Sequence, residues 1–201
     1  IDYDAGNTRS VLNALRLLGA EARLTRDPAQ IRSADHVILP GVGAFGDAMG
    51  KLRAGGLDRL LAETAASGRP LLGICLGQQL LFEASEESPG VPGLGLLPGV
   101  CRRLTEAPGL KIPQIGWNDL VYPEHRQGKS RLFAGVPEHS YVYFVHSYQA
   151  VPSDESVTAA VTEYGGRVTA AVESGNLRAC QFHPEKSAET GQRILSNFLR
   201  L

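Results

Sequence analysis

The sequence lacks the features of a disulfide-stapled, membrane-bound or nucleic-acid-binding protein. Its three cysteines are odd in number and widely spread, which excludes a framework of paired disulfides and favours a reducing, cytoplasmic location. The net charge is −1, from 20 basic and 21 acidic residues, so neither a nucleic acid nor an anionic membrane is indicated as a partner. No apolar run is long enough to span a membrane, and no signal peptide is visible.

The composition is that of a protein with a sizeable core. Hydrophobic residues make up 43% of the sequence, enough to bury an apolar interior without added cross-links. A length of 201 residues fits one large domain, and no repeat, linker or low-complexity segment divides it. We therefore expect a single domain over residues 1–201. Because Ile1 already lies inside an expected strand, we also expect residues before it to be missing.

The first half of the chain alternates expected strands and helices. Apolar runs and helical spacing predict the following order: a strand at 1–3, a helix around 11–18, strands at 21–25 and 35–39, helices at 47–54 and 57–67, a strand ending at Cys75, and a helix at 76–83. Such alternation is typical of a parallel sheet covered by helices on both faces.

The second half predicts antiparallel pairing. Strands are expected at 100–104, 141–145, 157–164, 167–173 and 177–182, followed by a closing helix. Gly165-Gly166 and Gly175-Asn176 are hairpin signals between the last three strands. The whole therefore predicts an α/β fold with a mixed sheet and an antiparallel flank.

A cysteine stands between two glycines where an apolar run meets a helix. Gly73, Cys75 and Gly77 form the pattern G-x-C-x-G, which is the nucleophile elbow with a thiol in place of a hydroxyl. The glycines are needed because side chains in so tight a turn would collide with neighbouring backbone. The alternative is that Cys75 is a small core residue, as free cysteines often are. The elbow alone leaves both interpretations open.

His183-Pro184-Glu185 supplies what a cysteine nucleophile needs. A free thiol is mostly protonated at neutral pH, and a paired imidazole increases its thiolate fraction. Glu185 lies two residues beyond His183, across a proline, so its carboxylate can reach back to the second ring nitrogen and fix the tautomer, as the acid of a serine triad does. Alone, the tripeptide is typical of a surface turn. With an elbow in the same chain, we interpret it as base and orienting acid.

The glycine-rich segment after Pro40 has three possible roles. It can be a plain loop, or it can bring backbone N–H groups to an oxyanion, with the N–H of Leu76 as the second donor. Gly41, Gly43 and Gly46 also match the dinucleotide-binding pattern G-x-G-x-x-G. That pattern needs an acidic residue at the end of the next strand, which here ends in Cys75, so dinucleotide binding is excluded.

These residues resemble the triad-type, class I glutamine amidotransferases. G-I-C-L-G at 73–77 and H-P-E at 183–185 occur throughout that superfamily. Further segments resemble its branch of glutaminase subunits of imidazole glycerol phosphate synthase: D-Y-D-A-G-N-T-R-S-V at 2–11, L-P-G-V-G-A-F-G-D-A-M at 39–49, G-I-C-L-G-Q-Q-L-L-F-E at 73–83, S-E-E at 85–87, G-L-G-L-L-P-G at 93–99, P-Q-I-G-W-N at 113–118, Y-F-V-H-S-Y at 143–148 and F-H-P-E-K-S at 182–187. The departures from the branch's pattern are Asp4, Thr8, Gln78 and Gln114.

The resemblance implies a three-layer, flavodoxin-like fold with an open, mainly parallel sheet, and a glutaminase without a cofactor or metal. Cys75, His183 and Glu185 would be catalytic, and Val42, Gly43 and Leu76 would form the oxyanion hole. The substrate-binding residues implied are Gly41, Gly77, Gln79, Glu83, His146 and Ser147. For Gln79 and Glu83 the alternative is a solvated helix face, and His146 can equally be a structural histidine.

The resemblance also implies a partner. In the family, ammonia passes to a separate (βα)₈-barrel cyclase subunit in a heterodimer, which makes imidazole glycerol phosphate and aminoimidazole carboxamide ribonucleotide in histidine biosynthesis. Residues matching positions that face this partner are Asn7, Pro113, Ile115, Trp117 and Lys186, although Trp117 can also be a half-buried core aromatic. Rival hypotheses are the glutaminase subunit of another amidotransferase, a cysteine-elbow hydrolase or chaperone-like protein, and a non-enzymatic binding module.

Overall fold

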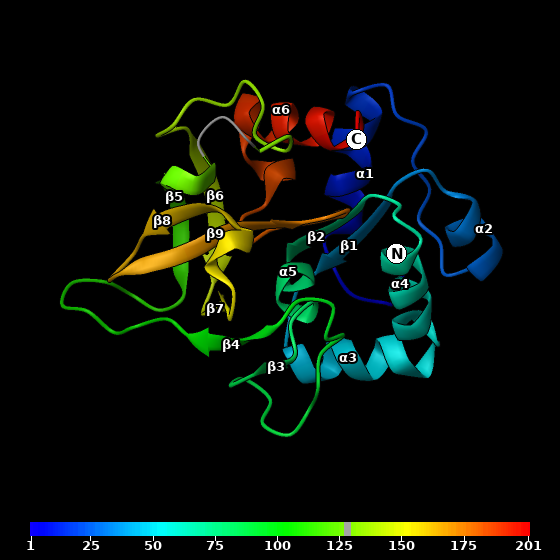
Figure 1. Ribbon diagram of the computed structural model, residues 1–201, viewed down its shortest axis with the longest axis horizontal. Coiled ribbons are helices and arrows are strands. Elements are labelled where there is room, and N and C mark those ends of the chain that lie inside the picture. Colours follow the sequence, from blue (N-terminus) through cyan, green and yellow to red (C-terminus); the bar gives the residue numbers. More distant parts are fainter. Residues whose placement is uncertain (127–129) are drawn as a thin grey trace.

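A five-stranded mixed sheet lies at the centre of the computed structural model, which describes residues 1–126 and 130–201 (Figure 1). The strand order is β1–β2–β10–β9–β8. β1 (Val37–Gly41), β2 (Leu71–Cys75) and β10 (Leu177–Cys180) are parallel neighbours. β9 (Arg167–Ser174) and β8 (Thr158–Glu163) continue the sheet antiparallel. The mixed α/β sheet with an antiparallel flank, and both hairpins, are thus confirmed.

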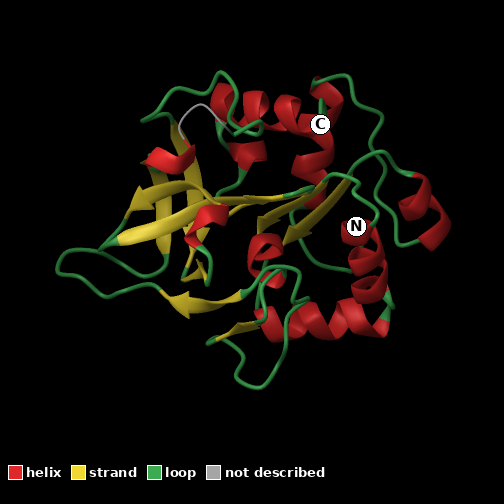
Figure 2. Cartoon of the chain, in the orientation of Figure 1, coloured by secondary structure: helices red, strands yellow, loops and turns green. Residues whose placement is uncertain are grey.

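Helices cover both faces of this sheet, as Figure 2 shows in red. α1 (Thr8–Leu17) and α6 (Ala188–Phe198) contribute their apolar residues to one core, together with Leu72 and Ile74 of β2. The opposite core contains Leu71, which points the other way because successive strand residues face opposite sides.

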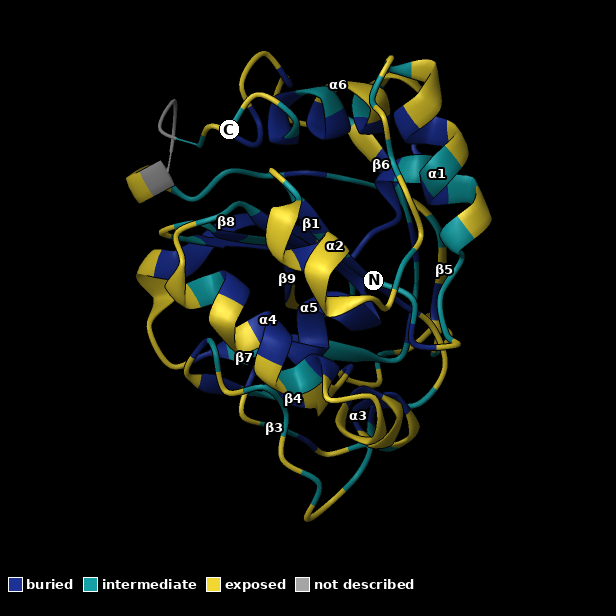
Figure 3. Ribbon diagram, turned by 90° about the vertical axis from the view of Figure 1, so that its right-hand side faces the viewer, coloured by how far each residue is buried: buried dark blue, intermediate teal, exposed yellow. Residues whose placement is uncertain are grey.

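The second face is covered by three helices, of which the first two are consecutive and the third follows β2. They are α3 (Phe45–Ala54), α4 (Leu57–Ala66) and the short α5 (Leu76–Leu80), and α2 (Pro28–Ser33) packs outside α4. Figure 3 shows the result: dark-blue strands between helices whose outer faces are yellow. None of the helices among the described residues has the length and apolar character needed to cross a membrane.

Two small sheets lie beside the main one. β3 (Ala84–Ser85), β4 (Gly99–Arg103) and β7 (Tyr148–Pro152) form the first, and β5 (Gln114–Asp119) pairs antiparallel with β6 (Tyr141–His146) in the second. Short 3₁₀ turns are found at η1 (Glu124–Arg126), η2 (Glu155–Val157) and η3 (Pro184–Lys186).

Two strands predicted near the N-terminus are absent from the described residues, because the contacts there do not form a ladder. The Ile1 ammonium donates to the carbonyl of Ile38 at 2.8 Å, and the Asp2 amide donates to the carbonyl of Thr25. Residues 1–3 and 21–25 therefore run as irregular chain beside β1.

The helix after Cys75 is also shorter than predicted. The amides of Leu81 and Phe82 bond to carbonyls only three residues earlier, and the amide of Glu83 already bonds to the carbonyl of Gly99. This tightening ends α5 at Leu80, so Glu83 does not share a helical face with Gln79.

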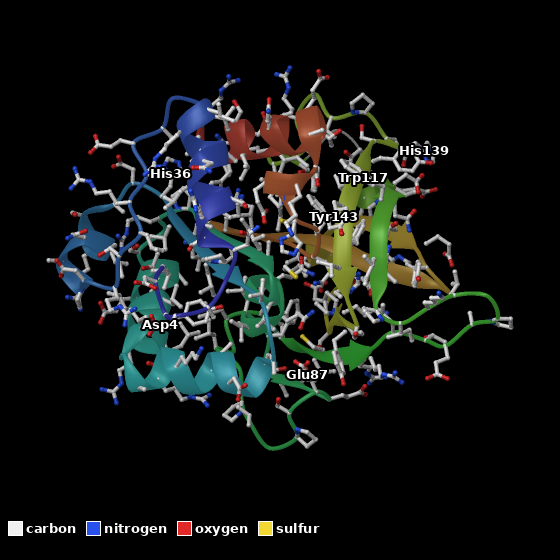
Figure 4. All side chains as sticks on the ribbon, turned by 180° about the vertical axis from the view of Figure 1, so that it is seen from behind. Asp4, His36, Glu87, Trp117, His139 and Tyr143 are labelled. Atoms are coloured by element: carbon white, nitrogen blue, oxygen red, sulfur yellow. The ribbon has the colours of Figure 1, made fainter. Side chains whose placement is uncertain are left out.

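Asp4, one of the departures from the family pattern, lies in the first loop at a positive φ of 59° (Figure 4). Short polar residues tolerate this left-handed conformation better than most. The Arg26 guanidinium bonds to Asp4 at 2.6 Å and to Asp2 at 2.9 Å, and it lowers the pKa of the Asp4 carboxyl.

Gln78, a second departure, is the basis of a stability prediction. Its side chain is fully buried, Nε2 makes one long 3.5 Å bond to the Thr169 carbonyl, and Oε1 has no partner among the described residues. An unpaired buried acceptor costs about 1–3 kcal/mol. We expect Gln78→Met, which fills a similar volume, to raise the free energy of unfolding in urea by about 1–2 kcal/mol. A stability that is unchanged or lower would show that Oε1 is satisfied in solution.

Candidate active site

Cys75 lies in a strained turn between β2 and α5. Its backbone angles are φ 56° and ψ −113°, a combination that a non-glycine residue adopts only when its surroundings force it. Close backbone packing on either side of Cys75 holds the turn, and the two flanking glycines make that packing possible. A Cβ on Gly73 would lie 2.6 Å from the carbonyl oxygen of Gly77, and one on Gly77 would lie 2.0 Å from that of Leu39. Only glycines allow the turn to close against β1.

Gly41 belongs to the same close packing. A Cβ there would lie 2.7 Å from the amide nitrogen of Gly77. The structure therefore places Gly41 and Gly77 where backbone meets backbone beneath Cys75, and neither is among the residues that line the cavity in front of it.

His183 and Glu185 form a buried pair just after β10. The His183 Nδ1 and Glu185 Oε1 atoms are 2.8 Å apart, and the two side chains are 3% and 0% exposed. The bend of η3, which begins at Pro184, returns the carboxylate to the ring two residues earlier. Asn7 adds a long 3.5 Å bond from its amide nitrogen to the same oxygen, so this predicted interface residue contacts the proposed orienting acid.

The second ring nitrogen of His183, Nε2, is buried and makes no well-aligned hydrogen bond among the described residues. Burial lowers the pKa of His183, but the polar and charge interactions with Cys75 and Glu185 outweigh it and raise the pKa to about 9. Its surroundings thus favour the imidazolium form. A cation beside a thiol favours the nucleophilic thiolate.

The loop that carries His183 is tied to β6 by two hydrogen bonds, and a third lies within the loop. The His183 amide donates to the Tyr143 carbonyl at 2.9 Å, and the Tyr143 amide donates to Ser187 Oγ at 2.9 Å. Ser187 Oγ in turn donates to the His183 carbonyl at 2.7 Å. These bonds fix the position of the His183 backbone relative to β6.

A cavity of about 330 Å³ opens in front of Cys75. Its lining includes the three residues predicted for an oxyanion hole, and Gly43 has a positive φ of 91°. The full set is Val42, Gly43, Cys75, Leu76, Gln79, Glu87, Pro113, Val145, His146, Ser147, Tyr148 and His183. Sequence segments that are far apart in the chain, including both halves of the proposed triad, thus converge on one cavity.

His146 lines this cavity as a neutral ring. Burial lowers its pKa to about 4, although a hydrogen bond to the Tyr148 carbonyl acts the other way. That carbonyl can only accept, so Nδ1 carries the proton at 2.8 Å. Nε2 faces the Gln114 side-chain amide at 2.9 Å across the β5–β6 pair. His146 is therefore both a cavity wall and a well-anchored structural histidine.

Glu83, predicted to bind substrate, does not line the cavity. It is exposed, and its carboxylate accepts the Gly99 amide at 2.8 Å. The carboxylate that does line the cavity is Glu87, which accepts the Phe45 amide at the start of α3 at 2.7 Å (Figure 4). The S-E-E segment at 85–87 was the available sequence signal for Glu87, but nothing local ranked it above Glu83.

Comparisons with known proteins agree with this geometry. The family model for class I glutamine amidotransferases matches residues 1–201. The chain belongs to the class I glutamine amidotransferase family. It is 51% identical to the imidazole glycerol phosphate synthase subunit HisH of Methanothermobacter thermautotrophicus, over 100% of this chain and 96% of that protein. It is 50% identical to the HisH subunit of Moorella thermoacetica, over 98% and 91%. The narrower resemblance predicted from the motifs is thus confirmed.

Solved structures show the same fold at lower identity. A crystal structure described as a glutamine amidotransferase superimposes with a TM-score of 0.74 at 24% identity, covering 98% of this chain and 94% of that one. The PurLQS structure from Thermotoga maritima gives 0.71 at 22% identity, over 99% and 95%.

An apolar patch on this amidotransferase chain contains four residues of β5 and β6: Ile115, Trp117, Tyr141 and Tyr143. Ile115 and Trp117 are 63% and 51% exposed, and neither belongs to a buried core cluster. Trp117 and Tyr143 pack edge to face with ring centroids 6.0 Å apart (Figure 4), and the exposed Lys186 ammonium lies 5.7 Å from the Tyr143 ring centroid. Pro113, predicted for the same interface, is exposed and also lines the cavity.

The three cysteines differ in a way that predicts their reactivity. Cys101 and Cys180 have no exposed surface; burial raises the pKa of Cys101 to about 12 and that of Cys180 well above its usual range. Cys75 opens onto the cavity, which His183 also lines. We expect iodoacetamide at mildly alkaline pH to label Cys75 alone, as read from peptide masses, and all three cysteines in denaturant. Comparable labelling of Cys101 or Cys180 in the folded chain would contradict this assignment.

Proposed function

We propose that this chain is the glutaminase subunit of imidazole glycerol phosphate synthase. It hydrolyses glutamine to glutamate and ammonia through Cys75, His183 and Glu185, and it passes the ammonia to a cyclase subunit in histidine biosynthesis. The observation that carries the proposal is the meeting of a cysteine elbow and a buried His–Glu pair on one cavity. The half-identical relatives, each named as a subunit of that synthase, support the choice among amidotransferases.

The chemistry follows from the order of the groups around Cys75. The thiolate attacks the side-chain amide carbon of glutamine, and backbone N–H groups of the Val42–Gly43 segment and Leu76 receive the developing oxyanion. His183 Nε2–H gives its proton to the departing ammonia, leaving a thioester on Cys75. The neutral imidazole then removes a proton from water, which attacks the thioester and releases glutamate. Glu185 keeps the ring oriented and stabilises its cationic form.

Glu87 and Gln79 suit the amino-acid end of the substrate. Glutamine carries an α-ammonium group, and Glu87 is a carboxylate on the cavity wall with one oxygen not used by the Phe45 amide. Both N–H groups of Gln79 are committed to protein acceptors, so its remaining oxygen can only accept from a substrate donor. Both groups therefore favour the cationic end of a free amino acid.

The partner proposal depends on the apolar patch of β5 and β6. Aromatic residues are enriched at protein interfaces relative to the rest of the surface, and the patch adjoins the loop that carries His183. A cyclase docked there would receive ammonia close to the cavity, using it to make imidazole glycerol phosphate and aminoimidazole carboxamide ribonucleotide. Co-purification of this chain with the cyclase distinguishes this proposal from a glutaminase subunit that serves another amidotransferase.

The triad proposal predicts a graded loss of activity. Cys75→Ala should abolish glutamine hydrolysis in the presence of the cyclase, and His183→Ala should nearly do so. Glu185→Gln keeps the size of the side chain but loses the charge that stabilises the imidazolium, and loss of the orienting acid costs about 10⁴ in turnover in a related triad. Steady-state glutamate release measures all three, with circular dichroism and cyclase binding as controls for folding. Near-normal activity of Glu185→Gln would place the carboxylate outside the mechanism.

The interface proposal predicts that activity depends on the partner. We expect the chain alone to hydrolyse glutamine slowly and to be stimulated by the cyclase with its nucleotide ligand. Trp117→Ala should weaken cyclase binding about thirtyfold or more, because central exposed aromatics are common hot spots, while Leu17→Ala, at an exposed position on α1 (79% exposed), should not. Titration of stimulated activity measures both. Full activity without the cyclase would favour a stand-alone glutaminase.

A further inference from the structure

The Cys75 sulfur has a polar neighbour besides His183. Gln181 is completely buried just after β10, and its Nε2 lies 3.8 Å from Cys75 Sγ. The carbonyl of Val145 lies at the same distance on another side and accepts the thiol proton. The Val145 carbonyl therefore favours the thiol, whereas a donor from Gln181 favours the thiolate, and the triad alone does not account for this buried glutamine.

The orientation of the Gln181 amide follows from a chain of hydrogen bonds. The two ends of an amide group look alike and must be assigned from their partners. The Tyr148 carbonyl can only accept, so the Gln79 group 2.9 Å from it is Nε2. That nitrogen also lies 2.9 Å from Gln181, which must present its oxygen. The Gln181 nitrogen is then left facing Cys75.

We propose that Gln181 is a second, permanent hydrogen-bond donor to the Cys75 sulfur and that Gln79 is the positioning residue that keeps it so turned. The inference rests on the proposed function, since it concerns the nucleophile of that reaction. His183 loses its proton to ammonia and must regain it, whereas an amide N–H never leaves. Gln181 therefore stabilises the sulfur anion both before attack and when the thioester collapses.

Gln181 can contact the Cys75 sulfur but not a substrate in the cavity. It is not among the residues that line the cavity, so its loss should lower kcat and leave KM nearly unchanged. The other titratable groups around Cys75 are His183 and His146, the buried Tyr3 and Cys180, and Glu87 across the cavity. None of these is altered by substitution of Gln181.

The test is the alkylation rate of Cys75 by iodoacetamide, resolved by peptide mass at two pH values. At about pH 6 we expect Gln181→Met to slow alkylation about tenfold, which corresponds to about 1.4 kcal/mol. At about pH 10 the rates should agree within about twofold, because a donor changes the thiolate fraction and not access. Gln78→Met is the matched control: the same substitution of a buried glutamine on α5, without contact to the sulfur.

The chain of hydrogen bonds from Gln79 through Gln181 to Cys75, called the relay below, predicts a second result. Gln79→Met should slow alkylation at about pH 6. The variant with both substitutions should be no slower than Gln181→Met alone, because the effects of substitutions within one hydrogen-bond network are not additive. Rates for Gln181→Met within twofold of the unsubstituted chain at both pH values, equal losses at both, or additive effects would overturn the proposal. If Gln181→Met does not fold, Gln181→Asn, too short to reach the sulfur while bonded to Gln79, serves the same test.

Alkylation requires no glutamine, so the two proposals fail separately. A tenfold effect at about pH 6 in a chain that hydrolyses no glutamine would retain the relay and overturn the proposed function. Normal hydrolysis with unchanged alkylation in Gln181→Met would do the reverse.

Discussion

The contact of the Gly77 backbone with the carbonyl of Leu39 is the constraint on which the site depends. Because a Cβ at Gly77 would lie 2.0 Å from that oxygen, α5 can begin directly against the end of β1. The turn before it must then be tight, and Cys75 takes the strained conformation at its apex. The same approach brings the Val42–Gly43 segment beside the N-terminus of α5, so nucleophile and proposed oxyanion donors have a common origin.

The Tyr148 carbonyl has a comparable role among the polar groups. It accepts from His146 Nδ1 and from Gln79 Nε2, and these two bonds determine the tautomer of one ring and the direction of two amides. A backbone oxygen held in the β4–β7 pair is rigid, so the order it imposes does not vary with pH. A charged side chain in its place would titrate and cost more to bury.

Local patterns predicted much of the fold and the core of the site. The hairpins at Gly165-Gly166 and Gly175-Asn176, the elbow at Cys75 and the His183–Glu185 pair all follow from residues close together in the chain. What failed depended on distant contacts. The role implied for Glu83 assumed a helix through residue 83, and helical spacing cannot show that α5 stops at Leu80. Gln181 was not singled out, because its side-chain partners come from α5 and β2.

The proposed partner surface and the triad loop meet at Tyr143. The ring of Tyr143 packs against Trp117 and lies under Lys186, while its backbone amide and carbonyl hold Ser187 and His183. β5 and β6 pair in a sheet of their own, which is joined to β8 of the central sheet through the bridge between Val121 and Val161. A partner covering the aromatic rings would therefore contact, through Tyr143, the loop that carries the proposed general acid. The proposed regulation of Cys75 by docking would need no longer path than this.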